Sequence, residues 1–480
     1  MPYKKSILAL ACSLCLTFSH AQHHDMSHKY TPPDDPLVAA KLREWKMLKF
    51  GLLMHWGTYS QWGIVESWSL CPEDEPWCIR RGPHAADWFG YKKAYEALRT
   101  EFNPIRFDPD RWAEAAADAG MRYMVFTTKH HDGFCMFDTR QTDYRITHPG
   151  TAFSTNPKAN ITKEVFDAFR KRGFMTGAYF SKPDWNTPDY WWSYFPPKDR
   201  NVSYDPAKYP ERWASFKKFT HAQMEELATD YGRVDILWLD GGWVRPKATI
   251  DPRVDWQRNI PYDQDIDMPT IAKKLRQLQP GMLIVDRTVA GAYENYATPE
   301  QSVPDTYLPY PWESCMTLGN SWSHVPNETY KSANTVVHML TTIISRNGSL
   351  LLNVGPRPDG AWDTAAYDRL AEIGKWMKVN AGAVYDTEAD PAILASGPWV
   401  FTKKDNDVFA FCRVAETEKT MPARMRIPYT SNKPVKQVRL LGSDARLKTI
   451  VSPDHIDIEI PPRLAAAPPA AHAWVFRISH

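Results

Sequence analysis

The sequence predicts an α/β protein in which a (β/α)8-like, TIM-type barrel is followed by a C-terminal antiparallel β-sandwich. Three observations support this prediction. Short apolar runs alternate with helix-period stretches over most of the chain. Each apolar run leads into polar or aromatic residues. After about residue 386 the pattern changes to short strand candidates separated by turn residues, as in an antiparallel sandwich.

The predicted barrel strands are six short apolar runs. They cover 50–54, 123–127, 176–180, 234–239, 282–285 and 349–353. Helix-period stretches lie between them and lead into glycines; these stretches are 109–119, 163–172, 210–231 and 269–278. The alternation is typical of parallel βα units, and polar residues after successive strands favour a barrel over an open sheet. No GxGxxG motif follows the first strand, which argues against a dinucleotide-binding fold.

The predicted domain boundary lies at residue 386. A helical pattern at 365–379 closes the barrel, which we assign to residues 22–385. The remaining segment, 386–480, carries the strand candidates of the predicted sandwich. These candidates are 399–402, 407–411, 435–441, 455–460 and 473–478.

Residues 1–21 have the features of an export signal. Lys4 and Lys5 precede the apolar run 7–18, and Ser19-His20-Ala21 offers small residues at the two positions that a signal peptidase reads. The run is too short to anchor the chain in a bilayer, and no later apolar run reaches spanning length. We therefore expect cleavage after Ala21 and an exported protein, periplasmic or secreted, with no membrane span.

The composition narrows the classes of partner. The net charge of the 480 residues is only +2 and no long charged run occurs, so nothing favours binding to nucleic acid or to a membrane surface. The chain has 20 Trp and 22 Tyr, and aromatic rings suit the apolar faces of sugars. Cys71 and Cys78 are close enough in sequence to pair in an oxidising compartment. No CxxC motif occurs among the five cysteines after residue 21, which argues against a structural zinc site.

Asp240 is the first candidate for catalysis. It directly follows the apolar run 234–239 and precedes two glycines, which let a ligand approach the backbone closely. Trp238, two residues earlier on the strand, points to the same face. An aspartate at such a place often only caps or turns the chain. The C-terminal end of a barrel strand is, however, also where barrel enzymes place catalytic groups.

Three histidines form a second group of candidates. His55 ends the first predicted strand, and His130 and His131 follow the second. On an extended segment adjacent side chains point in opposite directions, so His130 and His131 are a poor chelating pair. Neutral imidazoles donate hydrogen bonds to hydroxyls and accept them. We therefore predict that histidines and Asp240 face one opening, where they bind hydroxyl groups rather than a metal.

A second carboxylate is needed if the site is that of a retaining glycosidase, in which two carboxylates lie about 5–5.5 Å apart. Three glutamates follow Arg287, which ends a predicted strand: Glu294, Glu300 and Glu313. All three fall in a long loop or just past it. Sequence spacing does not choose among them.

The longer motifs resemble the α-L-fucosidases of glycoside hydrolase family 29, along nearly all of the chain after residue 21. The most specific matches are Lys129-His130-His131-Asp132-Gly133-Phe134 and the strand 235–241. Further matching segments are 50–57, 298–300, 312–313 and 351–356.

This resemblance implies a (β/α)-barrel with a C-terminal β-sandwich. It also implies retaining hydrolysis of terminal α-L-fucose from a fucosylated oligosaccharide or glycoconjugate, without a cofactor. Asp240 matches the nucleophile and Glu300, in its Thr-Pro-Glu context, the acid/base, with Glu294 and Glu313 as alternatives. The other implied site residues contact the sugar or the carboxylates: His55, His130, His131, Tyr179, Trp238, Arg287 and Trp322.

Some family members place a Glu-Trp pair in the loop after the first strand. Two segments of this chain are candidates for it, Asp87-Trp88 and Glu66-Ser67-Trp68, and the sequence does not choose between them. Two other functions stay open as alternatives. One is a non-catalytic protein that binds fucose or glycans in the same pocket, and the other is a metal-dependent hydrolase that uses His130 and His131.

Overall fold

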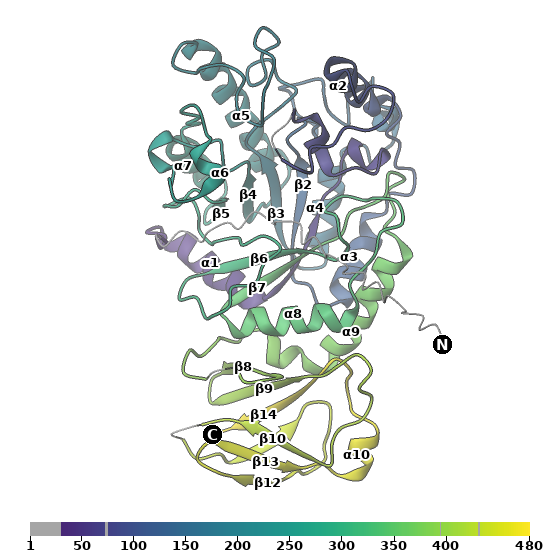
Figure 1. The fold of residues 1–480 in the computed structure, drawn as a ribbon, viewed down its shortest axis with the longest axis vertical. Coiled ribbons are helices and arrows are strands. Elements are labelled where there is room, and N and C mark those ends of the chain that lie inside the picture. Colours follow the sequence, from purple (N-terminus) through teal and green to yellow (C-terminus); the bar gives the residue numbers. More distant parts are fainter. Residues whose placement is uncertain (1–29, 73–74, 394, 431–432) are drawn as a thin grey trace, which may run out of the picture.

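The computed structural model describes residues 30–72, 75–393, 395–430 and 433–480 (Figure 1). The predicted signal peptide, 1–21, lies outside the described residues. Within the described part, no helix combines the length and the apolar character that a bilayer crossing requires.

The barrel sheet contains seven parallel strands (Figure 1). In space they follow the order β5-β4-β3-β2-β1-β7-β6. Every strand is buried along its length apart from the half-exposed last residue of β4, which is Asp240. The strands are β1 (Phe50–Met54), β2 (Tyr123–Lys129), β3 (Met175–Ser181), β4 (Ile236–Asp240), β5 (Leu283–Asp286), β6 (Trp312–Thr317) and β7 (Gly348–Asn353). The predicted barrel class is confirmed, with the sheet curled into an open ring of seven strands rather than eight.

One strand of the sheet, β6, was not expected from the sequence. Its residues Glu313 and Ser314 interrupt the apolar run, so the segment reads as loop. Glu313 is nevertheless fully buried, because Tyr123 and Trp238 hydrogen-bond its carboxyl group. Glu313 therefore lies just past the long loop, in a strand that the sequence pattern did not predict.

The segment 294–301 lies between β5 and β6, where a closed barrel would have its eighth strand. Its Asn295 N–H donates to the Ile284 carbonyl of β5 at 3.0 Å. On the other side, single parallel bridges join Ala297 to Trp312 and Glu300 to Cys315 of β6. These contacts hold Glu300 against the barrel edge.

Helices cover the outside of the sheet. Four of them confirm the predicted helical stretches, with ends that differ from the predicted ends by at most two residues. These are α3 (Pro109–Asp118), α4 (Ile161–Lys171), α5 (Pro210–Asp230) and α7 (Met268–Leu278). Asp108 and Asp267 accept hydrogen bonds from the first turns of α3 and α7. The glycines that follow these helices all have positive φ, which explains their position. The other helices are α1 (Pro36–Leu48), α2 (Trp88–Ala97), α6 (Asp255–Arg258), α8 (Ala333–Ser345), α9 (Thr364–Val384) and α10 (Pro462–Ala466).

The C-terminal part is an antiparallel β-sandwich, as predicted. One sheet has the strand order β11-β14-β9-β8 and the other the order β10-β13-β12. Their facing sides share one apolar core, which includes Phe401, Ala410, Ile427 and Ile458. The strands are β8 (Trp399–Lys404), β9 (Asp407–Arg413), β10 (Arg424–Pro428), β11 (Gln437–Leu440), β12 (Lys448–Val451), β13 (His455–Glu459) and β14 (Ala473–Ser479).

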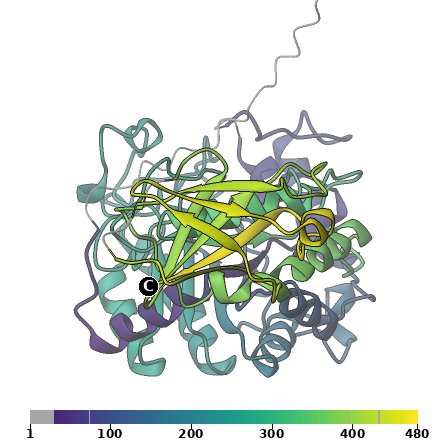
Figure 2. The same ribbon diagram turned by 90° about the horizontal axis from the view of Figure 1, so that it is seen from below.

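The sandwich packs on helices α8 and α9 of the barrel, and Figure 2 shows it in front of the barrel when the molecule is seen from below. Trp376 Nε1 of α9 donates to the Ala473 carbonyl at 2.9 Å, and Asn334 Nδ2 of α8 donates to the Val414 carbonyl at 2.9 Å. The domain boundary at 385/386 stays a prediction.

Candidate active site

The C-terminal ends of the barrel strands bring the predicted site residues together. His55 follows β1, His130 and His131 follow β2, and Asp240 ends β4. Tyr179 lies in β3, and its hydroxyl reaches Asp240. Because parallel strands end at the same edge of the sheet, side chains far apart in sequence share one opening.

Asp240 is bound through both carboxylate oxygens. Its Oδ1 accepts from Arg287 Nη1 at 2.9 Å, and its Oδ2 accepts from the Tyr179 hydroxyl at 2.6 Å. Burial alone would raise the pKa of Asp240. The guanidinium of Arg287 outweighs burial, with further help from His131 and Tyr179, and the pKa lies well below its usual range. Asp240 is therefore an ionised, positioned carboxylate at neutral pH.

Arg287 joins Asp240 to Glu300. Its Nη2 donates to Glu300 Oε2 at 2.8 Å, while Nη1 of the same planar group binds Asp240. The Arg287 side chain is itself held by a hydrogen bond from Nε to Thr298 Oγ1 at 3.0 Å, and it lies 4.3 Å over the Trp238 ring. Because the guanidinium is rigid, the two carboxylates bound by it are held side by side.

The exposure of the two carboxylates matches: the side chains of Asp240 and Glu300 are each 21% exposed. A ligand entering the opening can therefore reach both.

The other two glutamates lie elsewhere. Glu313 is 0% exposed, with Oε2 accepting from the Tyr123 hydroxyl at 2.8 Å and Oε1 from Trp238 Nε1 at 3.1 Å. Glu294 is also buried, and its Oε1 accepts the backbone N–H of Thr288 at 2.9 Å. The structure thus brings Glu300, rather than Glu294 or Glu313, onto the guanidinium that holds Asp240.

The histidines are buried and uncharged at neutral pH. Burial lowers the pKa of His55 to about 4 and that of His131 to about 3, and it places the pKa of His130 well below its usual value. His55 Nδ1 lies 2.9 Å from Asn353 Oδ1, and His130 Nδ1 pairs with the Ser67 hydroxyl. Neutral rings held in this way can exchange hydrogen bonds with the hydroxyls of a ligand.

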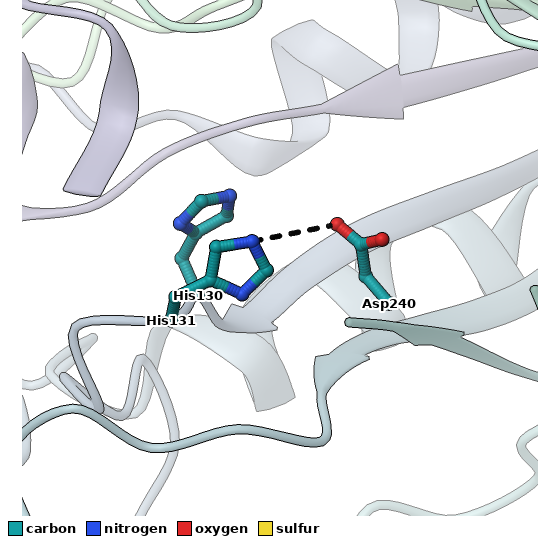
Figure 3. A group of neighbouring side chains, drawn as sticks. All are labelled: His130, His131 and Asp240. Carbon is teal, nitrogen blue, oxygen red and sulfur yellow. Dashed lines mark ion pairs between the residues drawn. The ribbon is translucent and has the colours of Figure 1, made fainter. Parts of the chain in front are cut away.

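Because His130 and His131 are adjacent, the sequence predicted that their side chains point in opposite directions. This prediction was wrong. Their ring centroids lie 4.2 Å apart. The reason is that β2 ends at Lys129 and the backbone turns, with the Gly133 N–H donating to the His130 carbonyl. Figure 3 shows the His131 ring facing Asp240, with Nε2 3.8 Å from Oδ2.

Among the described residues, His130, His131 and Asp240 form a group that could hold a metal ion, since their ligand atoms all lie within 4.8 Å of one another. The electrostatics of the group work against a cation, however. The Arg287 guanidinium already neutralises Asp240 at 2.9 Å, and Tyr179 occupies the second oxygen. The arrangement suits hydrogen bonding to an uncharged ligand better than coordination of a second positive charge.

Aromatic rings complete the walls of the opening. Tyr179 stacks on Trp238 with a centroid distance of 5.3 Å, and the Trp322 ring lies 5.1 Å from His55. Trp238 lies in β4, and Trp322 lies in the loop after β6. The site thus combines aromatic rings with hydrogen-bonding groups, which is what a sugar ring requires.

The segment Glu66-Ser67-Trp68 contributes to the site, and the sequence alone had not chosen it over Asp87-Trp88. The Trp68 ring lies 5.2 Å from His131, and Ser67 binds His130. Trp88, which begins α2, instead donates its Nε1–H to the Leu70 carbonyl.

Glu66 is buried beside the site. Its Oε1 accepts from the Ser323 N–H at 2.8 Å, and burial, together with the charges of Glu300 and Asp240, raises its pKa to about 7. Its φ of +32° is unusual for a residue other than glycine. Nothing in the local sequence signals this contact, because Glu66 and Ser323 are brought together only by the barrel.

Cys71 is buried and Cys78 is half-buried, and their pairing stays a prediction. Cys315 of β6 lies 3.8 Å from Arg287 Nη2 and is fully buried.

Comparison with known proteins agrees with this geometry. The family model described as "Alpha-L-fucosidase" matches residues 17–382. An α-L-fucosidase of Branchiostoma floridae is 26% identical over 472 residues, covering 94% of this chain and 96% of that protein. Human tissue α-L-fucosidase is 25% identical and covers 94% of this chain and 92% of its own length.

Solved structures of bacterial fucosidases share the fold. α-L-Fucosidase isoenzyme 1 from Paenibacillus thiaminolyticus superposes with a TM-score of 0.72 at 28% identity, over 92% of this chain and 99% of that one. A family 29 α-L-fucosidase from Bacteroides thetaiotaomicron has a TM-score of 0.72 at 21% identity, over 95% of this chain and 97% of that one. The chain therefore belongs to the α-L-fucosidase family of glycoside hydrolases.

Proposed function

We propose that this protein is a retaining exo-α-L-fucosidase that releases terminal α-L-fucose from fucosylated oligosaccharides or glycoconjugates. The observation that carries the proposal is the bridge from Asp240 through Arg287 to Glu300, at 2.9 and 2.8 Å. Retaining enzymes use carboxylates about 5–5.5 Å apart, whereas inverting enzymes separate them by roughly 6.5–9.5 Å to admit a water. Two carboxylates on adjacent nitrogens of one guanidinium favour the closer spacing.

The proposed reaction is a double displacement. In the first step Asp240 attacks the anomeric carbon, and Glu300 donates a proton to the departing oxygen. In the second step Glu300 takes a proton from water, which displaces Asp240 and releases fucose. Asp240 suits the role of nucleophile because the Arg287 guanidinium holds its pKa below the usual range and keeps it ionised.

The other site residues are assigned to the sugar. His55, His130 and His131, as neutral rings, exchange hydrogen bonds with the fucose hydroxyls. Tyr179 and Arg287 orient the carboxylates.

The three tryptophans near these residues supply apolar surface. Trp322 and Trp68 offer ring faces and edges to the C–H groups and the methyl of fucose, and Trp238, buried against Arg287 and Tyr179, supports these two residues. None of the assigned steps needs a cofactor, because two carboxylates supply both the nucleophile and the proton.

A related enzyme supports the covalent step. A family 29 α-L-fucosidase from Bacteroides thetaiotaomicron has been solved as a trapped covalent intermediate with 2-fluoro-fucosyl fluoride. We extend to this chain the inference that the fold accommodates such an intermediate. We also propose export, periplasmic or secreted, on the strength of the signal features of residues 1–21.

The stereochemistry of hydrolysis tests the proposal. Nuclear magnetic resonance during cleavage of an aryl α-L-fucoside should show α-L-fucose first, with the β anomer appearing only by mutarotation. Immediate formation of β-L-fucose would mean inversion. The absence of hydrolysis by a folded protein would instead favour the alternative of a non-catalytic glycan-binding barrel.

A further inference from the structure

A second polar pocket lies between the loop that follows β6 and the segment that links β7 to α9. Its volume is about 410 Å³, within the size range of small-ligand sites. The residues that line it are His324, Pro326, Asn327, Glu328, Tyr330, Arg357, Asp363 and Ala365.

The pocket lies next to the catalytic opening, along one continuous segment. Trp322 faces His55 in the opening, and the next residue, Ser323, holds Glu66. His324 then lines the second pocket. Three consecutive residues thus connect the proposed fucose site to this pocket.

The pocket loop is also connected to the segment that carries Glu300. Around the barrel the order is Asp240 on β4, Arg287 after β5, and Glu300 on the segment that bridges to β6. The Gln301 side chain donates to Thr317 Oγ1 at the end of β6, where the pocket loop begins. Since the proposed acid protonates the departing oxygen, the saccharide that carries this oxygen extends from the Glu300 side of the site.

The polar groups of the pocket are only loosely paired. His324 Nδ1 lies 3.5 Å from Asp363 Oδ2, and Arg357 Nη1 lies 3.5 Å from Asp363 Oδ1, both long for hydrogen bonds. His324 Nδ1 and Arg357 Nε are buried atoms that lack a hydrogen bond from the described residues. The Tyr330 hydroxyl makes a shorter contact, 2.7 Å to Asp363 Oδ2. Donors and acceptors are therefore available to a ligand.

The loop is preorganised around these groups. Lys331 Nζ donates to the carbonyls of Thr317 and Gly319, each at 2.7 Å, and so ties the end of the loop to its start. The Glu328 carboxylate accepts the N–H groups of Asn320 and Ser321 at 2.9 and 3.1 Å. A loop fixed by its own hydrogen bonds loses little entropy when a ligand binds.

The charged groups of the lining disfavour an anionic ligand, because the two carboxylates of Asp363 and Glu328 outnumber the one guanidinium, that of Arg357. Carboxylate, guanidinium, imidazole, amide and phenol groups together offer donors and acceptors for neighbouring hydroxyls.

We propose that this pocket binds the sugar units to which fucose is attached, and so makes the enzyme prefer fucosylated oligosaccharides over simple fucosides. This inference rests on the proposed fucosidase function.

The test compares two substrates, an aryl α-L-fucoside and a fucosylated lactose trisaccharide. The variants Arg357→Gln and Tyr330→Phe should lower the ratio of kcat/KM for the trisaccharide to kcat/KM for the aryl fucoside, by about tenfold for Arg357→Gln, mainly through KM. Lactose, as the product, should inhibit the wild-type enzyme more strongly than the variants. The matched control is Arg369→Gln on α9, whose partner is Glu372, and it should leave the ratio unchanged.

The outcomes separate the two proposals. If the wild-type enzyme hydrolyses the aryl fucoside but the variants keep the wild-type ratio and the wild-type inhibition by lactose, the pocket assignment is wrong. If the folded wild-type enzyme hydrolyses neither substrate, the proposed function itself fails. Thermal unfolding of each variant checks that a changed ratio does not come from a misfolded protein.

Discussion

The mouth of the barrel and the layer directly beneath it each hold a glutamate, but in opposite electrostatic surroundings. Glu300 at the mouth is bound by the Arg287 guanidinium at 2.8 Å and is 21% exposed. Glu313 in the layer beneath is fully buried, and its partners are the Tyr123 hydroxyl and Trp238 Nε1. Trp238 connects the two regions, since its ring faces Arg287 while its N–H reaches Glu313.

The difference shows that the partner, and not the residue type, decides what a carboxyl group can do. At the mouth the Arg287 guanidinium keeps Asp240 ionised in spite of burial. Beneath it, Glu313 has uncharged partners, and burial raises its pKa to about 7. A protonated Glu313 can donate to the Tyr123 oxygen, whose hydroxyl lies 3.4 Å from the Leu350 carbonyl. The carboxylates at the mouth are therefore suited to catalysis, whereas Glu313 stabilises the layer beneath them.

The largest expected effect comes from removing the carboxylate of Asp240. Asp240→Gly should lower kcat on an aryl α-L-fucoside by about 10⁴-fold or more, because the covalent route is lost. Added azide should restore part of the activity and yield β-L-fucosyl azide, since it enters from the vacated face. Near-normal turnover by the folded variant would remove Asp240 from its proposed role.

A smaller and substrate-dependent effect is expected at Glu300. Glu300→Ala should lower kcat/KM on a natural oligosaccharide by about 10²–10⁴-fold, the usual contribution of general acid catalysis. The first step with an aryl fucoside should suffer much less, because a good leaving group needs no proton. Rapid-mixing kinetics of both substrates measure this contrast.

Glu313→Gln is the matched control for Glu300→Ala. It keeps the shape of the buried side chain and the hydrogen bond from Trp238, and its amide can donate to the Tyr123 oxygen, so it should show no such dependence on the leaving group. Equal losses of Glu300→Ala on both substrates would point to Glu294 as the acid instead.

The barrel class and the place of Asp240 could be predicted from the sequence, whereas the contrast between Glu300 and Glu313 could not. The apolar run before Asp240 predicts the strand β4 that places this carboxylate at the mouth, and glycines with positive φ end the helices as expected. The second carboxylate could not be chosen from spacing, because the partners of Glu300 and Glu313 come from distant strands of the folded sheet. Arg287, which binds Glu300, follows β5, whereas Glu313 is bound from β2 and β4.

Two further features also depend on long-range contacts. The turn after Lys129 brings the rings of His130 and His131 together. The pairing of Glu66 with Ser323 joins residues 257 positions apart. Local pattern carries no signal for such contacts.

The smallest effect concerns stability rather than turnover. The folded protein binds a proton at Glu313 between about pH 4.5 and 7, where the unfolded chain has released it. The contribution of Glu313 to stability therefore falls as the pH rises through this window. Glu313→Gln lacks this proton, so its free energy of unfolding relative to wild type should rise with pH, by on the order of 1 kcal/mol per pH unit.

Denaturant unfolding at several pH values measures this difference. The exposed variant Glu418→Gln serves as the control and should follow the wild-type pH dependence. Parallel curves for wild type and Glu313→Gln would show that Glu313 is ionised in the folded protein, and the contrast between the two regions would disappear.

The central claim is that Asp240 forms a covalent bond to fucose. Incubation with 2-fluoro-fucosyl fluoride, followed by proteolysis and mass spectrometry, tests it directly. The account predicts one labelled peptide, containing residues 235–241 and carrying one fluorofucosyl group on Asp240, with loss of activity in proportion to labelling. Label on a different residue, or continued inversion-type hydrolysis without any label, would contradict it.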